Sequence, residues 1–353
     1  MTQDKTASAA LAATAAPTSA PGKNSKLSSA RRALSSARRA KNDEFYTRLE
    51  DIENELRHYR QHFRGKTVLL NCDDPETSNF WFFFSRNFDF LGLERLISTH
   101  YTGLGSDNPP PSYVLELRRD LSGGAVDPTQ PIRTDLKGDG DFRSDECVEL
   151  LKQSDVVVTN PPFSLFREYV GQLVEHDKKF LVIGNMNAIT YKELWPLIER
   201  GEMWLGSMPS FMGFKVPASS EPRSTRFWVD EVGQKWRSLG NACWFTNLDH
   251  DRRHEKLRLF RKYSPEKYPK YDNYDGINVD KVVDIPVDYD GAMGVPITFL
   301  GKHNPEQFEI VGQSRMLARR IEIGGKTPKD FVYHRTDGSF VYPYMRVVIR
   351  RKK

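Results

Sequence analysis

Four consecutive residues, Asn160-Pro161-Pro162-Phe163, interrupt a segment that otherwise reads as a buried strand running into a helix. The exocyclic amine of a nucleobase is a poor nucleophile because its lone pair is delocalised into the ring. An enzyme that alkylates this amine needs acceptors for its two N–H groups, and the Asn160 side-chain oxygen and the Pro161 carbonyl can supply them. The prolines stiffen the backbone and donate no N–H. Phe163 offers a face on which a base rotated out of a duplex could stack.

The alternative for these four residues is an ordinary turn between a strand and a helix, with proline near the first helical position. The preceding residues "DVVVT" (155–159) favour the functional interpretation, because they predict a buried strand whose carboxyl end carries Asn160. The sequence therefore predicts transfer of an alkyl group to a base amine at this position.

The segments around this motif alternate between strands and helices. Strands are predicted at 66–72, 95–101, 113–119, 155–160, 179–185, 202–206, 225–230 and 242–248, and helices at 42–63, 79–91, 146–153, 164–175 and 190–200. This alternation predicts an α/β fold with a doubly wound, mostly parallel, Rossmann-like sheet. Ligands bind at the carboxyl ends of the strands of such sheets.

Beyond residue 250 the regular alternation ends. The segment 251–353 is rich in Tyr, Pro and Asp and predicts a smaller, irregular α+β module with its basic residues facing outward. His250 and His254 lie four residues apart, a spacing that could bind a metal on a helix. The neighbouring carboxylates lack the HExxH spacing, so a surface helix without a metal is the favoured interpretation.

The formal net charge of +5 is unevenly distributed. Residues 1–42 hold eight Lys and Arg against one acidic residue, and residues 251–353 hold 21 against 14, so that the middle of the chain is acidic. Basic ends favour contact with a polyanion by the ends of the chain, the alternative being ordinary solvated surface charge.

Residues 1–40 are rich in Ala, Ser and Thr and cannot bury enough surface to fold alone. The repeat "SSARRALSSARRA" places Arg31 and Arg32 seven residues before Arg38 and Arg39. We expect a disordered basic arm that binds nucleic acid, the alternatives being a linker or tag. The composition is also similar to that of an organellar transit peptide.

Three cysteines, Cys72, Cys147 and Cys243, are too few and too scattered for a disulfide framework or a zinc cluster. No apolar run reaches the ~18 residues needed to span a membrane. We therefore expect a soluble protein in a reducing compartment, without a metal and without contact with a membrane.

Several motifs occur in a characteristic order between about residues 41 and 249: "NDEFYTRLEDIENEL", "LLNCDDPETSNF", "GDF", "VVVTNPPFSLF", "FLVIGNMNAIT" and "GNACWFTNL". Together they resemble the amino-group methyltransferases that use S-adenosyl-L-methionine, and most of all the EcoRI-type adenine-specific DNA methyltransferases. The resemblance implies that Asn160, Pro161, Pro162 and Phe163 are the catalytic residues.

The resemblance also implies a set of cofactor contacts. Phe45, Tyr46 and Thr47 would meet the methionine end, Asp141 of "GDF" would meet the adenine, and the remaining contacts would come from Asn71, Asp73, Asp74 and Asn160. The loop "NCDDP" (71–75) has no glycine, unlike the general methyltransferase pattern, although the EcoRI-type group shares this form. The strand at 95–101 ends in Thr99-His100-Tyr101, without the usual acid for the ribose hydroxyls.

These observations predict a site-specific methyltransferase that modifies N6 of a flipped adenine in double-stranded DNA. Residues 1–40 would be the arm, 41–250 the catalytic domain and 251–353 the target-recognition module. The alternatives are an RNA guanine-N2 or protein-glutamine methyltransferase, or an inactive DNA-binding protein on the same fold. A cognate restriction endonuclease is a possible genetic partner, and the expected location is the cytoplasm, for a protein that is bacterial or encoded by a phage or plasmid.

Overall fold

The computed structural model describes residues 47–72, 74–103, 111–119, 124, 126–208, 213–216, 218, 226–238, 240–318, 329–335 and 337–352. Residues 43–353 form one compact unit. Several predicted site residues lie outside the described ranges, namely Arg31, Arg32, Arg38, Arg39, Phe45, Tyr46 and Asp73.

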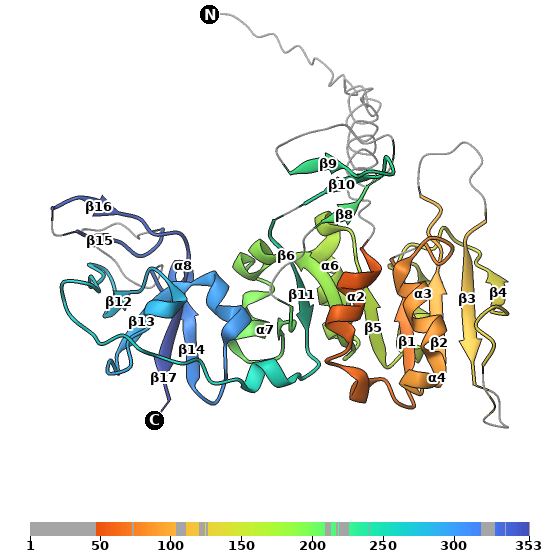
Figure 1. The fold of residues 1–353 in the computed structure, drawn as a ribbon, viewed down its shortest axis with the longest axis horizontal. Helices are drawn as coiled ribbons and strands as arrows, with labels where there is room; N and C mark the ends of the chain where they lie inside the picture. Colours follow the sequence, from red (N-terminus) through yellow and green to blue (C-terminus); the bar gives the residue numbers. More distant parts are fainter. Residues whose placement is uncertain are drawn as a thin grey trace, which may run out of the picture. The chain divides into compact units, whose positions relative to one another are not determined.

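The centre of the fold is an eight-stranded sheet with the order β4-β3-β2-β1-β5-β6-β11-β7 (Figure 1). Its strands are β1 (Thr67–Leu70), β2 (Arg95–Thr99), β3 (Tyr113–Arg118), β4 (Ile132–Asp135), β5 (Val156–Thr159), β6 (Lys179–Asn185), β7 (Trp204–Leu205) and β11 (Ala242–Thr246). The central strands β2, β1, β5 and β6 pair in parallel, whereas β3, β4, β11 and β7 join by antiparallel pairs. Only β3 and β11 therefore run against the other strands, and the predicted mostly parallel α/β sheet is confirmed.

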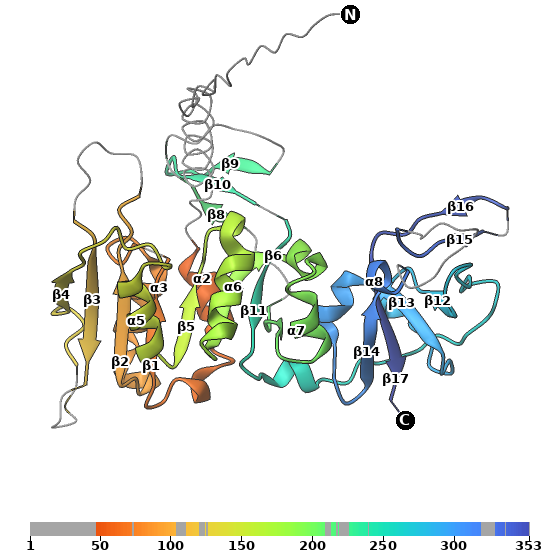
Figure 2. The same ribbon diagram turned by 180° about the vertical axis from the view of Figure 1, so that it is seen from behind.

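Helices cover both faces of this sheet (Figures 1 and 2). They are α2 (Leu49–Leu56), α3 (Asn79–Arg86), α4 (Phe88–Leu91), α5 (Asp145–Gln153), α6 (Phe166–Glu175) and α7 (Trp195–Glu199). Alternate residues of a strand point to opposite faces. Accordingly, Val68 and Leu70 pack with Ile52 and Phe84 of α2 and α3, whereas Leu69 packs with Leu173 of α6. The sheet is thus doubly wound. Within the described residues no helix has the length and apolarity needed to cross a bilayer.

Several predicted helices are shorter than their apolar periodicity indicates. The helix expected at 42–63 is reduced to α2 and a 3-10 turn, η1 (Arg60–His62), within the described residues. The helix expected at 79–91 is divided at Asn87 into α3 and α4. The segment expected to be helical at 190–200 contains only α7, which follows the 3-10 helix η3 (Met186–Thr190). Pro196 lies in the first turn of α7, where its missing N–H costs no hydrogen bond.

The C-terminal part of the chain contains a four-stranded sheet of order β12-β13-β17-β14 and a two-stranded sheet, β15-β16. The elements are η4 (Asp251–His254), β12 (Gly276–Asn278), η5 (Val282–Asp284), β13 (Ala292–Pro296), η6 (Ile297–Lys302), β14 (Phe308–Gln313), α8 (Ser314–Ala318), β15 (Tyr333–His334), β16 (Phe340–Val341) and β17 (Arg346–Arg351). One buried apolar cluster contains both Leu69 of β1 and Ile349 of β17. The core is therefore continuous across residue 250.

The expected surface helix around His250 and His254 is wrong in part. Only one 3-10 turn, η4, forms there, and His250 is buried with its Nε2 atom 3.1 Å from the carbonyl oxygen of Leu205. His254 is exposed and lies between the carboxylates of Asp249 and Glu306, at 2.8 and 3.3 Å. The pair is separated because His250 precedes the turn and points into the protein.

A small sheet is inserted between β7 and β11. It consists of β8 (Phe214–Lys215), β9 (Phe227–Val229) and β10 (Lys235–Arg237), in the antiparallel order β8-β10-β9. The strand expected at 225–230 is present as β9, but it belongs to this separate antiparallel sheet and not to the central one. Figure 1 shows this sheet, in green, beyond the end of the central sheet towards which the parallel strands run. We refer to it as the inserted sheet.

A buried carboxylate connects α2 to the chain that leads into the inserted sheet. Glu55 is 0% exposed and accepts hydrogen bonds from Tyr59 Oη at 2.7 Å and from the backbone N–H groups of Ser207 and Met208, both at 2.6 Å. Burial raises the pKa of Glu55 to about 7, although these three hydrogen bonds and the charge of Arg252 act to lower it. Glu55 therefore holds residues 207–208 against α2.

Candidate active site

The carboxyl ends of four neighbouring strands define one edge of the central sheet. Asn71 follows β1, His100 follows β2, Asn160 follows β5, and Asn185 ends β6. Because β2, β1, β5 and β6 are adjacent and parallel, these four residues lie along the same edge. The fold thus places the predicted Asn160 motif beside the predicted cofactor loop that begins at Asn71.

The Asn160 motif is held firmly between β5 and α6. Asn160 is only 8% exposed, and Pro161 is also buried. The carbonyl oxygen of Pro162 accepts a hydrogen bond from Leu165 N at 2.9 Å, which opens a 3-10 turn, η2 (Phe163–Leu165). Phe163 is half-buried and packs against the apolar cluster under α2 and α3. The ring is therefore partly accessible at the edge of the sheet.

A tyrosine from α6 orients Asn71. The hydroxyl of buried Tyr169 donates a hydrogen bond to Asn71 Oδ1, and the ring of Phe142 packs edge-on against Tyr169 at 5.0 Å. Asn71 is itself buried, and its Nδ2 atom has no hydrogen-bond partner among the described residues. Asn71 therefore presents an N–H donor whose direction is set by Tyr169.

His100 directly follows β2 and is held by two neighbours. Its Nδ1 atom lies 3.3 Å from Asp74 Oδ1, and its ring stacks on Tyr113 at 4.7 Å. Gly140 approaches so closely, with φ +80°, that a Cβ atom would collide with the His100 carbonyl oxygen. The loops after β1 and β2 and the loop containing Asp141 thus meet at one place. The sequence Thr99-His100-Tyr101 alone did not predict the contact between His100 and Asp74.

Asp141 is engaged by a neighbouring arginine. Its carboxylate accepts hydrogen bonds from Arg143 Nε at 2.8 Å and Nη2 at 2.6 Å. Burial acts to raise the pKa of Asp141, but the hydrogen bonds and charge of Arg143 outweigh it and lower the pKa below its ordinary value. The carboxylate is therefore ionised at neutral pH and able to accept a further hydrogen bond.

The buried polar atoms at this edge that lack a hydrogen-bond partner among the described residues include Thr47 Oγ1, Asn71 Nδ2 and Thr99 Oγ1. The Thr47 backbone is fixed, because its carbonyl accepts a hydrogen bond from Asn79 Nδ2 at 2.7 Å. Buried polar groups without partners cost free energy unless water or a ligand satisfies them. Hydroxyl and amide groups of this kind fit a ligand with amino, carboxylate and ribose groups, such as the cofactor that the sequence implies.

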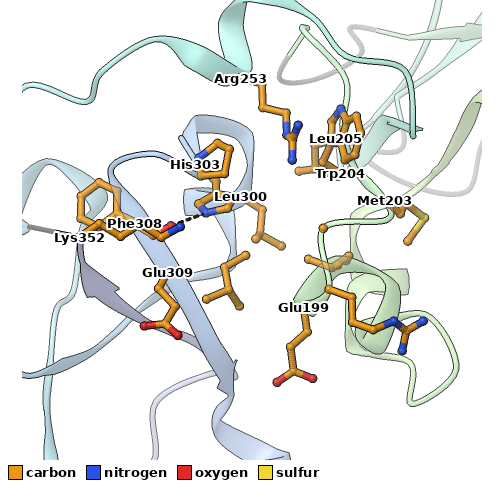
Figure 3. Close-up of a pocket in the computed structure, with 15 residues that line it drawn as sticks. Glu199, Met203, Trp204, Leu205, Arg253, Leu300, His303, Phe308, Glu309 and Lys352 are labelled. Carbon is orange, nitrogen blue, oxygen red and sulfur yellow. Dashed lines mark hydrogen bonds between the residues drawn. The ribbon is translucent and has the colours of Figure 1, made fainter.

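A cavity of about 360 Å³ lies elsewhere, between α7 and β7 on one side and β14 and η6 on the other (Figure 3). The guanidinium of Arg253 lies 3.8 Å from the ring centre of Trp204, and His303 Nε2 is 3.1 Å from the Phe308 carbonyl oxygen. Burial lowers the pKa of His303 to about 4, so this side chain is neutral at physiological pH. No predicted site residue lines the cavity.

Sequence reasoning missed two features near the active-site edge. Tyr344, which precedes β17, donates a hydrogen bond from its hydroxyl to Asn187 Oδ1 of η3 at 3.3 Å, so the C-terminal part reaches the end of β6. Trp228 and Trp236 stack on the inserted sheet. The segment "RFWVDEVGQKWR" could have predicted this hairpin, because two runs of aromatic and basic residues flank a turn that contains Asp and Gly.

Comparison with known proteins shows the family to which the chain belongs. The model of the family described as "Adenine-specific methyltransferase EcoRI" matches residues 33–352. The chain is 46% identical to the Type II methyltransferase M.EcoRI of Escherichia coli, over 91% of this chain and 96% of the relative. It is 42% identical to the Type II methyltransferase M.MpnI of Mycoplasma pneumoniae, over 78% of this chain and 83% of the relative. No solved structure matches significantly. The chain therefore belongs to the EcoRI family of adenine-specific methyltransferases.

Proposed function

We propose that this protein transfers a methyl group from S-adenosyl-L-methionine to N6 of an adenine that is rotated out of double-stranded DNA at a specific site. The observation that carries the proposal is the position of Asn160-Pro161-Pro162-Phe163, buried at the carboxyl end of β5 and beside the loop after β1. The proposed location is the bacterial cytoplasm, where DNA is accessible. The Type II names of the relatives favour a cognate restriction endonuclease as a genetic partner.

The chain's own residues would act by position and by preorganised acceptors. Asn160 Oδ1 and the Pro161 carbonyl would accept the two N6 hydrogens, so that the nitrogen lone pair turns out of the ring. Phe163 would stack on the extruded base. When bound, S-adenosyl-L-methionine supplies an electrophilic methyl group on its sulfonium. The proton released from N6 passes to solvent, and none of these residues is needed as a base.

The cofactor would be held by groups at the same edge. Asn71 would donate a hydrogen bond to the polar end of the cofactor, and Thr47 would offer its hydroxyl there. Asp141 would accept a hydrogen bond from the adenine of the cofactor. Asp74 and Asn160 would lie nearby. Phe45, Tyr46 and Asp73 complete the set that the family resemblance implies. The partnerless buried atoms Thr47 Oγ1 and Asn71 Nδ2 support this assignment.

The decisive experiment is mass spectrometry of nucleosides from duplex DNA treated with the protein and isotopically labelled cofactor. The expected product is labelled N6-methyladenine. Parallel reactions with RNA and with protein test the alternative acceptors, guanine N2 and glutamine. Label in RNA or protein but not in DNA would overturn the proposal. Binding of the cofactor without transfer to any acceptor would indicate an inactive DNA-binding protein.

Phe163→Ala is expected to lower the single-turnover rate or the affinity for DNA by the equivalent of ~1–3 kcal/mol, because base stacking on an aromatic face is lost. Phe163→Tyr and Phe163→Trp keep an aromatic face and should retain activity. Since Phe163 also packs against the core, thermal unfolding of each variant is measured in parallel. Full activity of a stably folded Phe163→Ala variant would show that the ring serves packing alone.

Deletion of residues 1–40 is expected to weaken binding of cognate and random duplexes alike, because interactions with phosphates carry no sequence information. The deletion removes four arginines that would bind phosphates, namely Arg31, Arg32, Arg38 and Arg39. The slope of log K against log salt should then flatten by ~0.9 for each phosphate contact that is lost. Specificity, which we assign to residues 251–353, should persist. The measurement is binding of both duplexes at several salt concentrations. An unchanged slope would identify the arm as a linker.

A further inference from the structure

The inserted sheet has an inner and an outer face. Cross-strand partners share a face of an antiparallel sheet. Lys215, Trp236 and Trp228 are such partners and form one row across the three strands. The adjacent row contains Phe214, which is 0% exposed, and Phe227, and both pack against the apolar cluster under α2 and α3. The row of Lys215, Trp236 and Trp228 therefore faces away from the core, and we call it the outer row.

Both indoles of the outer row are held in place. Trp236 donates a hydrogen bond from Nε1 to Asp230 Oδ2 at 2.8 Å, and the other carboxylate oxygen of Asp230 accepts the backbone N–H of Val232 and Gln234, at 3.1 and 2.8 Å. The Trp228 ring lies nearly parallel to that of Trp236, with an interplanar angle of 12°. Trp228 also covers Gly213 so closely that a Cβ atom there would collide with the ring.

Side chains on a protein surface are seldom held as firmly as these two indoles. Trp228 is 42% exposed, so its ring leaves a large apolar area in water. Holding the exposed Trp228 ring against Trp236, which the hairpin turn fixes in turn, adds little to the core. Ordered, exposed aromatic side chains instead mark surfaces that bind a partner.

The charges of the inserted sheet favour a nucleic acid as the partner. Lys215 lies in the outer row itself, paired with Trp236, whereas Lys235 and Arg237 alternate with Trp236 on β10 and lie on the other face. The described residues 213–216 and 226–238 together carry four cations, Lys215, Arg226, Lys235 and Arg237, against two acids, Asp230 and Glu231. The Asp230 carboxylate is already engaged by Trp236 and the turn. Flat aromatic faces beside cations are the combination that binds bases and phosphates together.

The inserted sheet is anchored at the active-site edge. Phe227 and Phe163 pack against the same apolar cluster. Between β10 and β11, Asn241 accepts a hydrogen bond from Met186 N at 2.7 Å and donates from Nδ2 to Asn185 Oδ1 at 2.8 Å, at the end of β6. Both views show the inserted sheet beyond that end of the central sheet (Figures 1 and 2). A duplex whose base reaches Asn160 must pass this edge.

We propose that the outer row, Lys215, Trp236 and Trp228, is a DNA-binding surface that contacts the strand flanking the target adenine. It would act in addition to the arm and to residues 251–353. The inference rests on the proposed function for the identity of the DNA, and Trp228 would provide its main contact, through stacking on a base or packing on a sugar.

The first test compares Trp228→Ala and Lys215→Ala with the parent protein on duplex DNA. Each variant is expected to raise KM for DNA, by about tenfold for Trp228→Ala, with kcat at saturating DNA and cofactor affinity unchanged. Phe90→Ala is the matched control, because Phe90 is also an exposed aromatic residue beside an arginine, Arg60, but lies on α4 at the opposite edge of the sheet. It should leave KM for DNA unchanged.

A second test uses the intrinsic fluorescence of Trp228. Of the six tryptophans, Trp81, Trp195 and Trp244 are buried and Trp204 and Trp236 are half-buried, so quenching by bound DNA should come mainly from the exposed Trp228. Trp228→Phe is expected to keep most of the affinity and lose most of the quenching. Parent-like KM for Trp228→Ala together with undiminished quenching in Trp228→Phe would overturn the inference.

Two further outcomes can be distinguished from each other and from the expected result. If Trp228→Ala changes the sedimentation coefficient but not the affinity for DNA, the outer row binds a second copy of the chain and the inference is wrong. If the parent protein binds and is quenched by DNA but methylates none, the proposed function fails and the outer row stands as a DNA-binding surface.

Discussion

Replacement of Asn160 by alanine is expected to slow methyl transfer by at least ~100-fold, equivalent to ~2.7 kcal/mol of barrier, while cofactor affinity changes little. Loss of one preorganised acceptor from a water-poor site has an effect of this size. Asn160 is buried at the end of β5, so its side-chain oxygen is held in a place that bulk water reaches poorly. The cofactor would rest mainly on Thr47, Asn71, Asp74 and Asp141, which the substitution does not touch.

The measurement is the single-turnover rate on duplex DNA, with cofactor affinity determined by calorimetry. Asn187→Ala is the matched control, because Asn187 is an exposed amide at the end of β6, on the same edge of the sheet. It should transfer methyl groups at nearly the parent rate. Near-parent transfer by Asn160→Ala would remove Asn160 from the catalytic assignment. Equal losses of transfer and of cofactor affinity would indicate that Asn160 serves mainly to bind the cofactor.

The second large effect concerns stability rather than catalysis. The pKa of Glu55 is about 7 in the folded protein and 4.5 for an ordinary glutamate, so the folded state binds the extra proton between these values. The contribution of Glu55 to the free energy of unfolding is therefore fully present below pH 4.5 and is lost as pH rises through 7. Between pH 5 and pH 8 the loss from this one group should be about 2.5 kcal/mol.

Glu55→Gln removes the titration and keeps the shape of the side chain. The free energy of unfolding of the variant is expected to lack this pH dependence, so that the difference between parent and variant changes by about 2.5 kcal/mol between pH 5 and pH 8, in the direction of a less stable parent at the higher pH. The measurement is denaturant unfolding at several pH values, with m checked for constancy. Glu53→Gln, on the exposed side of α2, is the matched control and should leave the pH dependence unchanged. A difference between parent and Glu55→Gln that does not vary with pH would contradict the assigned pKa.

Much of the fold could be predicted because the signals were local. The apolar runs that became β1, β2, β5 and β6 are properties of four to seven neighbouring residues, and the switch to helical periodicity after each run indicated the parallel sheet. Asn160-Pro161-Pro162-Phe163 was recognisable for the same reason. The four residues that would perform the chemistry are consecutive, so no knowledge of distant contacts was needed to find them.

The sequence by itself determined the parallel α/β architecture and the family, and it predicted the Asn160 motif as the place of the chemistry. Only the tertiary structure decided which distant side chains meet. Tyr169 reaches Asn71 across 98 positions, His100 meets Asp74 through the pairing of β1 with β2, and Glu55 meets Ser207 across 152 positions. Likewise, the sequence shows Trp228 and Trp236 only as aromatic residues of a hairpin. The burial of Phe214 in the core shows that the two indoles lie on the opposite, outer face of the inserted sheet. The physical reason is that periodicity records only the conformation of neighbouring residues. Contacts between distant residues depend on the order of the strands and on which face of each element is buried.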